Sequence, residues 1–249
     1  MLIKRLSIIG VGLIGASLAS GLRKAGECGE VVGCGRGVEN LRKAIDLGII
    51  DRYYHDPVEA VQGADMVIVA VPLGSIANIF KSINNALASK AIVTDVGSAK
   101  LSVINDAKQY LTQHLPYFVP GHPIAGSEKS GVTAFNPNLF NNNRVILTSL
   151  PETESQATAL VKTMWEIVGA KVINMQAAHH DQVLAATSHL PHLLAYSLVN
   201  TLAKMDSKTE IFQFAAGGFR DFTRIASSDP HMWHDICLSN QESILQMLE

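Results

Sequence analysis

Residues 6–16 read LSIIGVGLIGA, and this stretch decides the fold. An apolar run typical of a buried strand leads directly into Gly10, Gly12 and Gly15, and a helical pattern follows over residues 14–25. In such a strand–turn–helix unit the first glycine permits the tight turn and the second lets a pyrophosphate approach the backbone. The third lets the helix pack closely on the strand. The stretch therefore predicts a dinucleotide-binding turn.

Short apolar runs alternate with helical patterns after this turn. The predicted strands are residues 6–9, 31–34, 65–71, 91–95, 117–119, 144–148 and 171–174, and the predicted helices are residues 14–25, 38–47, 75–87, 100–112 and 152–168. This alternation predicts right-handed βαβ units, and hence an α/β domain of Rossmann type with a doubly wound parallel sheet.

After residue 175 the pattern predicts helices alone, broken at Pro191, at Gly217-Gly218 and near Pro230. We therefore divide the chain into a dinucleotide-binding domain, residues 1–175, and an all-helical domain, residues 176–249. The helical part is small for an independent core, so we expect it to pack on the first domain and on a second subunit, forming a homodimer.

Composition excludes several classes of protein. The 249 residues include 20 Lys and Arg against 22 Asp and Glu, and a net charge of −2 predicts no attraction to nucleic acid or to anionic membranes. Lys4 and Arg5 precede an uncharged run that superficially copies a secretory signal, but its glycines would weaken a membrane helix, so we expect no targeting or transmembrane segment. Cys28, Cys34 and Cys237 lack C-x-x-C spacing, which argues against a disulfide scaffold and favours a reducing cytoplasm.

The second half of the dinucleotide fingerprint is missing. NAD sites carry an Asp or Glu about 20 residues after the glycines, which binds the adenosine ribose. Here the second predicted strand is followed by Gly35 and Arg36, so no carboxylate repels a 2′-phosphate and Arg36 could pair with one. The sequence favours NADP, with NAD and an unliganded loop arginine as the alternatives. The predicted cofactor contacts are Gly10, Gly12, Leu13, Ile14, Gly15, Gly35, Arg36, Val71, Pro72 and Ser98.

His122 is the strongest candidate for a general base. Ligands of an open α/β sheet lie at the carboxyl ends of its strands, and residues 121–131, GHPIAGSEKSG, follow a predicted strand. We interpret this segment as an exposed loop, where an imidazole that titrates near neutral pH can meet a substrate. Ser98 could bind a reacting hydroxyl, or could only cap the helix predicted from residue 100.

Two further motifs lie in the helical part. His189 and His192 belong to the run SHLPH and share a helix face if the helix continues through the proline. Paired histidines can bind a metal, but no third ligand stands at zinc-protease spacing, so we favour substrate binding and expect no metal. Arg220 and Arg224 have a spacing suited to carboxylate recognition, although this spacing alone favours an ordinary solvated helix face.

Five motifs in order, GVGLIG, VTDVGSAK, GHPIAGSEKSG, SHLPH and GGFRDFTRIASSDPHMW, resemble the prephenate dehydrogenase family, which includes arogenate and cyclohexadienyl dehydrogenases of tyrosine biosynthesis. The resemblance covers essentially the whole chain. It implies a cytoplasmic enzyme that uses NAD(P) for the oxidative decarboxylation of prephenate to 4-hydroxyphenylpyruvate, of arogenate to tyrosine, or of both.

The resemblance also implies roles for individual residues. His122 would accept the proton of the ring hydroxyl while hydride leaves for the nicotinamide, and Ser98 would orient His122 and that hydroxyl. His189 and His192 would line the substrate pocket, and Arg224 would bind a substrate carboxylate, which fits the need of a buried dianion for paired cations. The further pocket or gating positions matched by the resemblance are Arg220, Asp221, Glu128 and Trp233.

Two departures and two alternatives accompany this interpretation. Gly35 and Arg36 stand where NAD-preferring members have an acidic residue, and family members usually continue beyond the position of Glu249, so we expect the native chain to be longer. Another Rossmann-plus-helical dehydrogenase of a small hydroxy acid would leave SHLPH, the Gly-His-Pro run and the distal arginines unexplained together. A non-catalytic NADP-binding protein would leave His122 and Arg224 without a role. The sequence does not distinguish prephenate from arogenate as substrate.

Overall fold

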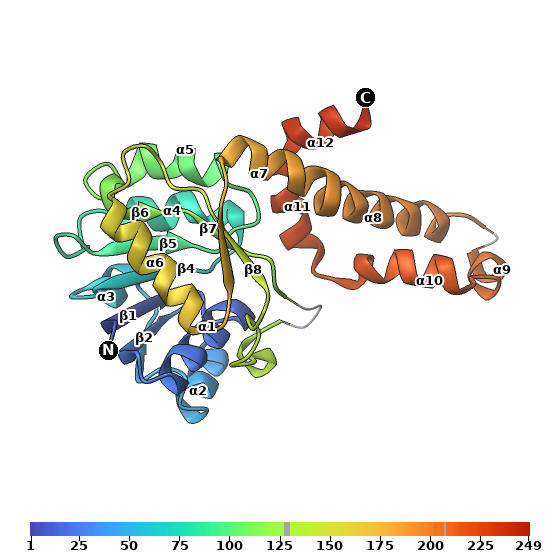
Figure 1. Cartoon of the computed structure of the whole chain (residues 1–249). Helices are drawn as coiled ribbons and strands as arrows, with labels where there is room; N and C mark the ends of the chain where they lie inside the picture. The colour runs from blue at the N-terminus through green and yellow to red at the C-terminus, as the bar shows by residue number, and fades with distance from the viewer. Residues whose placement is uncertain (127–129, 207) are drawn as a thin grey trace.

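A computed structural model describes residues 1–126, 130–206 and 208–249 and contains a parallel sheet in its first part (Figure 1). The strands of this sheet within the described residues are β1 (Ile3–Ile9), β2 (Cys28–Cys34), β3 (Arg52–Tyr54), β4 (Met66–Val69), β5 (Ile92–Asp95) and β6 (Phe118–Val119). They are ordered β3-β2-β1-β4-β5-β6, and every neighbouring pair is parallel. The strand order reverses between β1 and β4, which is where a doubly wound sheet binds its ligand. The predicted Rossmann-type fold is confirmed.

Helices cover both faces of this sheet. They are α1 (Leu13–Lys24), α2 (Val38–Asp46), α3 (Pro57–Val61), α4 (Leu73–Ile83), α5 (Leu101–Tyr110) and α6 (Ser155–Ile167). Successive residues of a strand point to opposite faces, and in β4 Ile68 joins the apolar cluster of Trp165 while Val67 joins the cluster of Phe80. Because both faces of β4 are buried, its sequence is apolar throughout instead of alternating.

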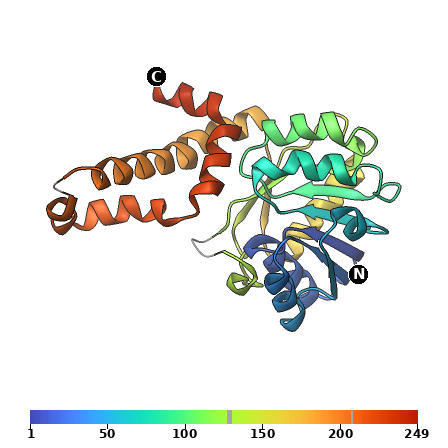
Figure 2. The ribbon, with the colours of Figure 1, turned by 180° about the vertical axis from the view of Figure 1, so that it is seen from behind.

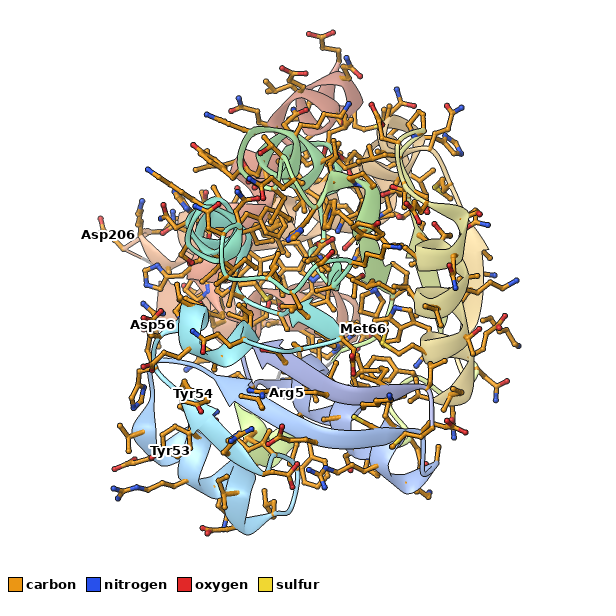
Figure 3. The ribbon with its side chains drawn as sticks, turned by 90° about the vertical axis from the view of Figure 1, so that its left-hand side faces the viewer. Arg5, Tyr53, Tyr54, Asp56, Met66 and Asp206 are labelled. Atoms are coloured by element: carbon orange, nitrogen blue, oxygen red, sulfur yellow. The ribbon has the colours of Figure 1, made fainter. Side chains whose placement is uncertain are left out.

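The edge strand β3 and the helix α3 were not predicted. Both are short, and β3 reads RYY, which has no apolar run. Figure 3 labels Tyr53 and Tyr54 on this strand and Asp56 just after it. The Asp56 carboxylate accepts a hydrogen bond from the Val58 N–H at 2.8 Å and so caps α3.

The last two predicted strands lie not in the first sheet but in a second, three-stranded sheet. Its strands are β7 (Gly121–Pro123), β8 (Arg144–Leu147) and β9 (Lys171–Asn174), with β8 antiparallel to β7 and parallel to β9. Residues 121–123 were predicted as an exposed loop, and this prediction is wrong: the strand pairs His122 with Ile146, and all three of its residues are buried. Short 3₁₀ turns, η1 (Leu115–Tyr117) and η2 (Val132–Ala134), lie on either side of β7 in the chain.

The remaining described residues are helical, as predicted, but the predicted break at Pro191 is wrong. α7 (Ala177–Leu184), the π-helical turn η3 (Ala185–His189) and α8 (Leu190–Ala203) follow one another without interruption. Pro191 stands at the start of α8, directly after the π turn, where its missing N–H is tolerated as in the first turn of a helix. The two histidines of SHLPH therefore remain on one continuous helical rod.

After α8 the chain turns back toward the sheet domain through further helices (Figure 1). They are α9 (Lys208–Gln213), α10 (Gly217–Thr223), the 3₁₀ turn η4 (Arg224–Ser227), α11 (Pro230–Ser239) and α12 (Gln241–Leu248). The predicted breaks at Gly217 and Pro230 coincide with the starts of α10 and α11. In two opposite views, α8 and α10 run side by side and project from the sheet domain as an arm (Figures 1 and 2). Within the described part of the chain, no helix has the length and apolar character needed to cross a bilayer.

Candidate active site

The glycine turn between β1 and α1 has the geometry that a dinucleotide requires. Gly10 has a φ of +100°, and a Cβ there would lie 2.2 Å from the Ala70 carbonyl oxygen, so only glycine fits. A Cβ at Gly15 would lie 2.7 Å from the Gly10 oxygen, which explains the close packing of helix on strand. At Gly12, by contrast, a Cβ would meet no heavy atom within 4 Å, and no side chain caps the helix that starts at Leu13. The helix N-terminus is thus open to a pyrophosphate, and the residues fit the group.

The segments predicted to hold the rest of the cofactor lie at the carboxyl ends of neighbouring strands. Gly35 and Arg36 follow β2, and the Arg36 side chain is exposed. Val71 and Pro72 follow β4, and Pro72 immediately precedes α4. The His55 ring donates from Nδ1 to the Gly35 carbonyl oxygen at 2.8 Å. A side chain that follows β3 thus holds the backbone that follows β2. These positions surround the end of the sheet next to the glycine turn.

A buried ion pair that sequence reasoning missed connects the end of β5 with β7. Asp95 and Lys100 are fully buried, and the Lys100 ammonium donates to the Asp95 carboxylate. The same ammonium donates to the Gly121 carbonyl oxygen at 2.7 Å, and the Asp95 carboxylate accepts from the Gly121 N–H at 3.2 Å. Both bonds hold the residue before His122. The sequence feature that could have indicated this ion pair is the spacing of Asp95 and Lys100, five positions apart in VTDVGSAK.

His122 is buried, with 8% of its surface exposed, and it lies in a chain of hydrogen bonds that sequence reasoning also missed. Its Nδ1 lies 2.8 Å from Nε2 of His180, and Nδ1 of His180 lies 2.7 Å from Oδ1 of Asp181. His180 and Asp181 come from α7, so the helical part supplies the partners of a histidine on β7. Burial, with smaller effects of His180, Lys100 and His189, holds the pKa of His122 well below its usual value. The ring is therefore neutral, the form that can accept a proton.

Ser98 does not cap the helix that follows it. The N-cap position of α5 is Lys100, and no side chain at that position caps the helix. The cap comes from Asp181, which accepts the Lys100 N–H at 2.8 Å and the Leu101 N–H at 2.9 Å. Ser98 is half-buried after β5, three residues beyond Asp95, and the capping role is taken by another residue.

His189 presents a buried hydrogen-bond donor without a partner. Asn240 donates from Nδ2 to the Asp181 backbone oxygen at 2.8 Å and lies 3.0 Å from Nδ1 of His189. Because the amide nitrogen is a donor, Nδ1 of His189 accepts and its Nε2 carries the hydrogen. That Nε2 is buried and has no hydrogen-bond partner among the described residues. Burial lowers the pKa of His189 to about 4, so the ring is a neutral donor.

His192 and Trp233 form the adjoining part of the site. Their rings stack with centroids 3.6 Å apart, and the Trp233 indole donates to the Ser228 hydroxyl at 2.8 Å. Burial lowers the pKa of His192, the hydrogen bond with the Ser188 carbonyl opposes this effect, and the charge of Arg224 lowers the pKa further. The structure thus brings His189 and His192, three positions apart in the sequence, together with the distant Trp233, while the exposed Arg224 acts on His192 through its charge.

The remaining predicted site residues are not joined to this cluster. Arg220 and Asp221 are exposed on α10. Glu128 lies outside the described residues. No group of three His, Cys, Asp or Glu in the described ranges is arranged to hold a metal ion. The cluster near His122 therefore presents one neutral imidazole as a base and one neutral imidazole donor, Nε2 of His189, near the carboxyl end of the sheet.

Family models match both parts of the chain. The model described as prephenate dehydrogenase, nucleotide-binding domain, matches residues 18–174, and the model described as prephenate dehydrogenase, dimerization domain, matches residues 176–249. Among curated proteins, the cyclohexadienyl dehydrogenase of Zymomonas mobilis is 38% identical, over 99% of this chain and 84% of that protein.

Solved structures with the same arrangement include two dehydrogenases. Prephenate dehydrogenase from Aquifex aeolicus in complex with hydroxyphenyl propionate and NAD+ has a TM-score of 0.91 at 40% identity, covering 98% of this chain and 85% of that one. Synechocystis arogenate dehydrogenase has a TM-score of 0.81 at 30% identity, covering 98% of this chain and 86% of that one. The sheet domain and the helical arm are thus both found in these relatives.

Proposed function

Since the chain belongs to the prephenate dehydrogenase family, we propose that it oxidises and decarboxylates prephenate, arogenate or both, with NAD(P) as the oxidant. The observation that carries the proposal is the position of His122: a buried, neutral imidazole at the carboxyl end of the sheet that also carries the open glycine turn. Neither a simple hydroxy-acid dehydrogenase nor a non-catalytic binding protein accounts for that imidazole together with the adjoining histidines and arginine.

The reaction follows from the one nitrogen of His122 that His180 leaves available. When bound, the nicotinamide ring supplies the hydride acceptor. Nε2 of His122 takes the proton of the ring hydroxyl as hydride leaves the carbon that bears it, and Ser98 orients that hydroxyl. The ring carboxylate then leaves as CO2, the electrons of the broken bond aromatise the ring, and the new phenol oxygen recovers the proton from His122. Aromatisation makes the reaction effectively irreversible.

Substrate recognition is assigned to the cluster beside His122. His189 donates from its unpartnered Nε2 to a substrate oxygen, a bond that removes the cost of a buried unsatisfied group. Arg224 binds a substrate carboxylate next to His192, whose ring Trp233 holds by stacking. Arg220, Asp221 and Glu128 remain proposed pocket or gating positions on the strength of their motifs.

We assign NADP as the preferred cofactor, with NAD as the alternative. The supporting observation is the exposed Arg36 after β2, at the strand end where NAD enzymes place a carboxylate for the ribose. A guanidinium there can pair with a 2′-phosphate in a bidentate manner.

A homodimer assembled through the helical arm completes the proposal, with the domain boundary at residue 175. Within α8, all of which the structure describes, Ala195 alone is buried although most of the helix is apolar. An apolar groove of about 250 Å³ between α8 and α11 is lined by Leu193, Tyr196, Pro230, Trp233, His234, Cys237 and Leu238. A second copy of this arm would cover such a surface. The three free cysteines fit a reducing cytoplasm as the place of action.

A steady-state assay that crosses prephenate and arogenate with NAD and NADP tests the proposed function. We expect reduced cofactor to appear, followed by its absorbance, with at least one substrate and faster with NADP than with NAD at limiting cofactor. A panel of small hydroxy acids serves as the control. Turnover of a hydroxy acid with neither cyclohexadiene substrate consumed would replace the proposal by the alternative dehydrogenase.

A further inference from the structure

The partners of His122 decide which of its two nitrogens carries a hydrogen. The chain His122–His180–Asp181 contains two contacts at ordinary hydrogen-bond distance, 2.8 Å and 2.7 Å, and all three side chains are buried. Imidazole nitrogens can donate or accept, so the direction of such a chain is fixed only by a partner that has a single role. Asp181 is that partner.

The Asp181 carboxylate is committed to accepting. Oδ1 accepts the Lys100 N–H and Oδ2 accepts the Leu101 N–H, and backbone N–H groups can only donate. These two amides form the N-terminus of α5, whose dipole favours a negative charge at this position. Nδ1 of His180 therefore donates to Oδ1, and in the neutral ring, which carries a single hydrogen, Nε2 of His180 is left as an acceptor.

We propose that His180 and Asp181 are positioning residues that hold His122 in the form with hydrogen on Nδ1, leaving Nε2 free as the catalytic base. With Nε2 of His180 accepting, Nδ1 of His122 must donate to it. The opposite form of His122, which is the commoner one for a free imidazole, would place a hydrogen on Nε2 and block proton abstraction. The inference rests on the proposed function for its catalytic consequence, but not for the hydrogen positions themselves.

The same carboxylate stabilises His122 after proton transfer. Once Nε2 has taken the hydroxyl proton, Lys100 and His189 nearby oppose the positive charge of the ring, as His180 does when it is itself protonated. The hydrogen bond to His180, which is itself bound to Asp181, is the described contact that favours the charged ring. Asn240 keeps this segment of α7 in place by donating to the Asp181 carbonyl oxygen.

Two variants of His180 separate positioning from packing. In His180→Phe the ring volume is kept but the acceptor is lost, and we expect kcat to fall about 10–100-fold, part of the range a general base contributes. In His180→Gln the side-chain oxygen can accept from Nδ1 of His122, and we expect kcat within about 10-fold of the unmodified enzyme. In both variants the KM of the substrate and the Kd of NADP should change little. Neither substrate binding nor NADP binding depends on the charge of His122.

Nitrogen NMR of the histidine-labelled holoenzyme gives a readout that does not depend on activity. His122, assigned by the loss of its signals in His122→Asn, should carry hydrogen on Nδ1 in the unmodified chain and shift toward the Nε2 form in His180→Phe. Hydrogen on Nε2 in the unmodified chain would overturn the inference even if His180→Phe failed to fold. So would a folded His180→Phe with unchanged kcat. If neither substrate is turned over by the unmodified chain, the proposed function fails, while the NMR result still decides the hydrogen positions.

Discussion

The imidazole of His122, the proposed base, lies in surroundings that oppose its protonation. Burial holds the pKa of His122 below its usual value of about 6.5, and the ring acts as a base only when it is neutral. The pH must therefore fall below the usual titration range of histidine before His122 becomes protonated and can no longer act as a base. We expect kcat/KM to stay level on lowering the pH through about 6.5 and to fall only at more acidic pH. A pH profile with an acid limb centred at or above that value would contradict the burial argument.

Removal of the same imidazole should affect turnover and leave cofactor binding intact. We expect His122→Asn to lower kcat by about 10²–10⁴-fold, because the substrate hydroxyl loses its proton acceptor. The glycine turn is built from β1 and α1 and does not involve this residue, so NADP titration should give an unchanged Kd. His179→Asn, in an exposed residue beside His180, is the matched control and should have normal kcat. A His122→Asn enzyme with near-normal turnover would remove the base from the mechanism.

Arg36 is the residue on which cofactor choice is expected to depend. We expect Arg36→Ala to weaken NADP binding roughly 10–100-fold, the value of a charge-assisted hydrogen bond, and to leave NAD nearly unchanged. Arg42→Ala, another exposed arginine close by on α2, should change neither. Kd values for the two cofactors, measured by fluorescence titration, make the comparison. Equal losses for NAD and NADP would mean that Arg36 does not meet a 2′-phosphate.

At the scale of elements, the turn between β1 and α1 contains two glycines with different roles: Gly10 is required by the fold and Gly12 by the proposed cofactor binding. Gly12→Ala adds a methyl group to open space, so we expect an unchanged melting temperature but greatly weakened cofactor binding, since the pyrophosphate needs that space. Gly10→Ala forces a Cβ against the Ala70 carbonyl at a positive φ, and we expect destabilisation of about 1–3 kcal/mol or more. Thermal melts and NADP titrations of both variants test this division. Normal NADP affinity in Gly12→Ala would place the pyrophosphate elsewhere.

Elements with a clear hydrophobic period were predictable, and those set by distant partners were not. The apolar run of β4 and the glycine spacing before α1 are local signals, and both elements were found where the sequence indicates. β7 contains Gly121 and Pro123, which favour a loop, and it becomes a strand only because β8, more than 20 positions away, pairs with it. The π turn η3 likewise lets the helix continue to Pro191, which no local pattern indicates.

The site residues likewise fall into those that a local motif indicates and those that only the packing of the chain identifies. Motif and resemblance identified His122, Ser98, His189 and Arg224 as residues of interest. The partners of His122 were missed because His180 is separated from it by 58 positions and is recognised only through the geometry of packing. Buried polar groups must find hydrogen-bond partners, but a sequence does not say which ones.

On the scale of the whole molecule, the base and its partners belong to different parts of the chain. β7 carries His122, whereas α7 carries His180 and Asp181, and Asn240 after α11 binds both Asp181 and His189. The proposed catalytic cluster therefore exists only while the helical part is packed on the sheet domain. Contacts that steady the helical arm should in consequence act on catalysis as well as on stability.

Association of two arms is the contact that the exposed apolar surface predicts. Leu194 of α8 is 46% exposed and Leu238 of α11 is 56% exposed, and a monomer would leave both in water beside the apolar groove. We expect sedimentation to give a dimer, and Leu194→Glu with Leu238→Glu to shift it toward monomer, because a buried unpaired carboxylate opposes association. Gln62→Glu, in an exposed residue of the sheet domain, adds the same kind of charge and should leave the dimer intact. Since α7, which carries His180 and Asp181, continues directly into α8 of the arm, we expect the monomeric double variant to lose kcat as well. A double variant that remains dimeric would move the interface away from this groove, and a fully active monomer would separate association from catalysis.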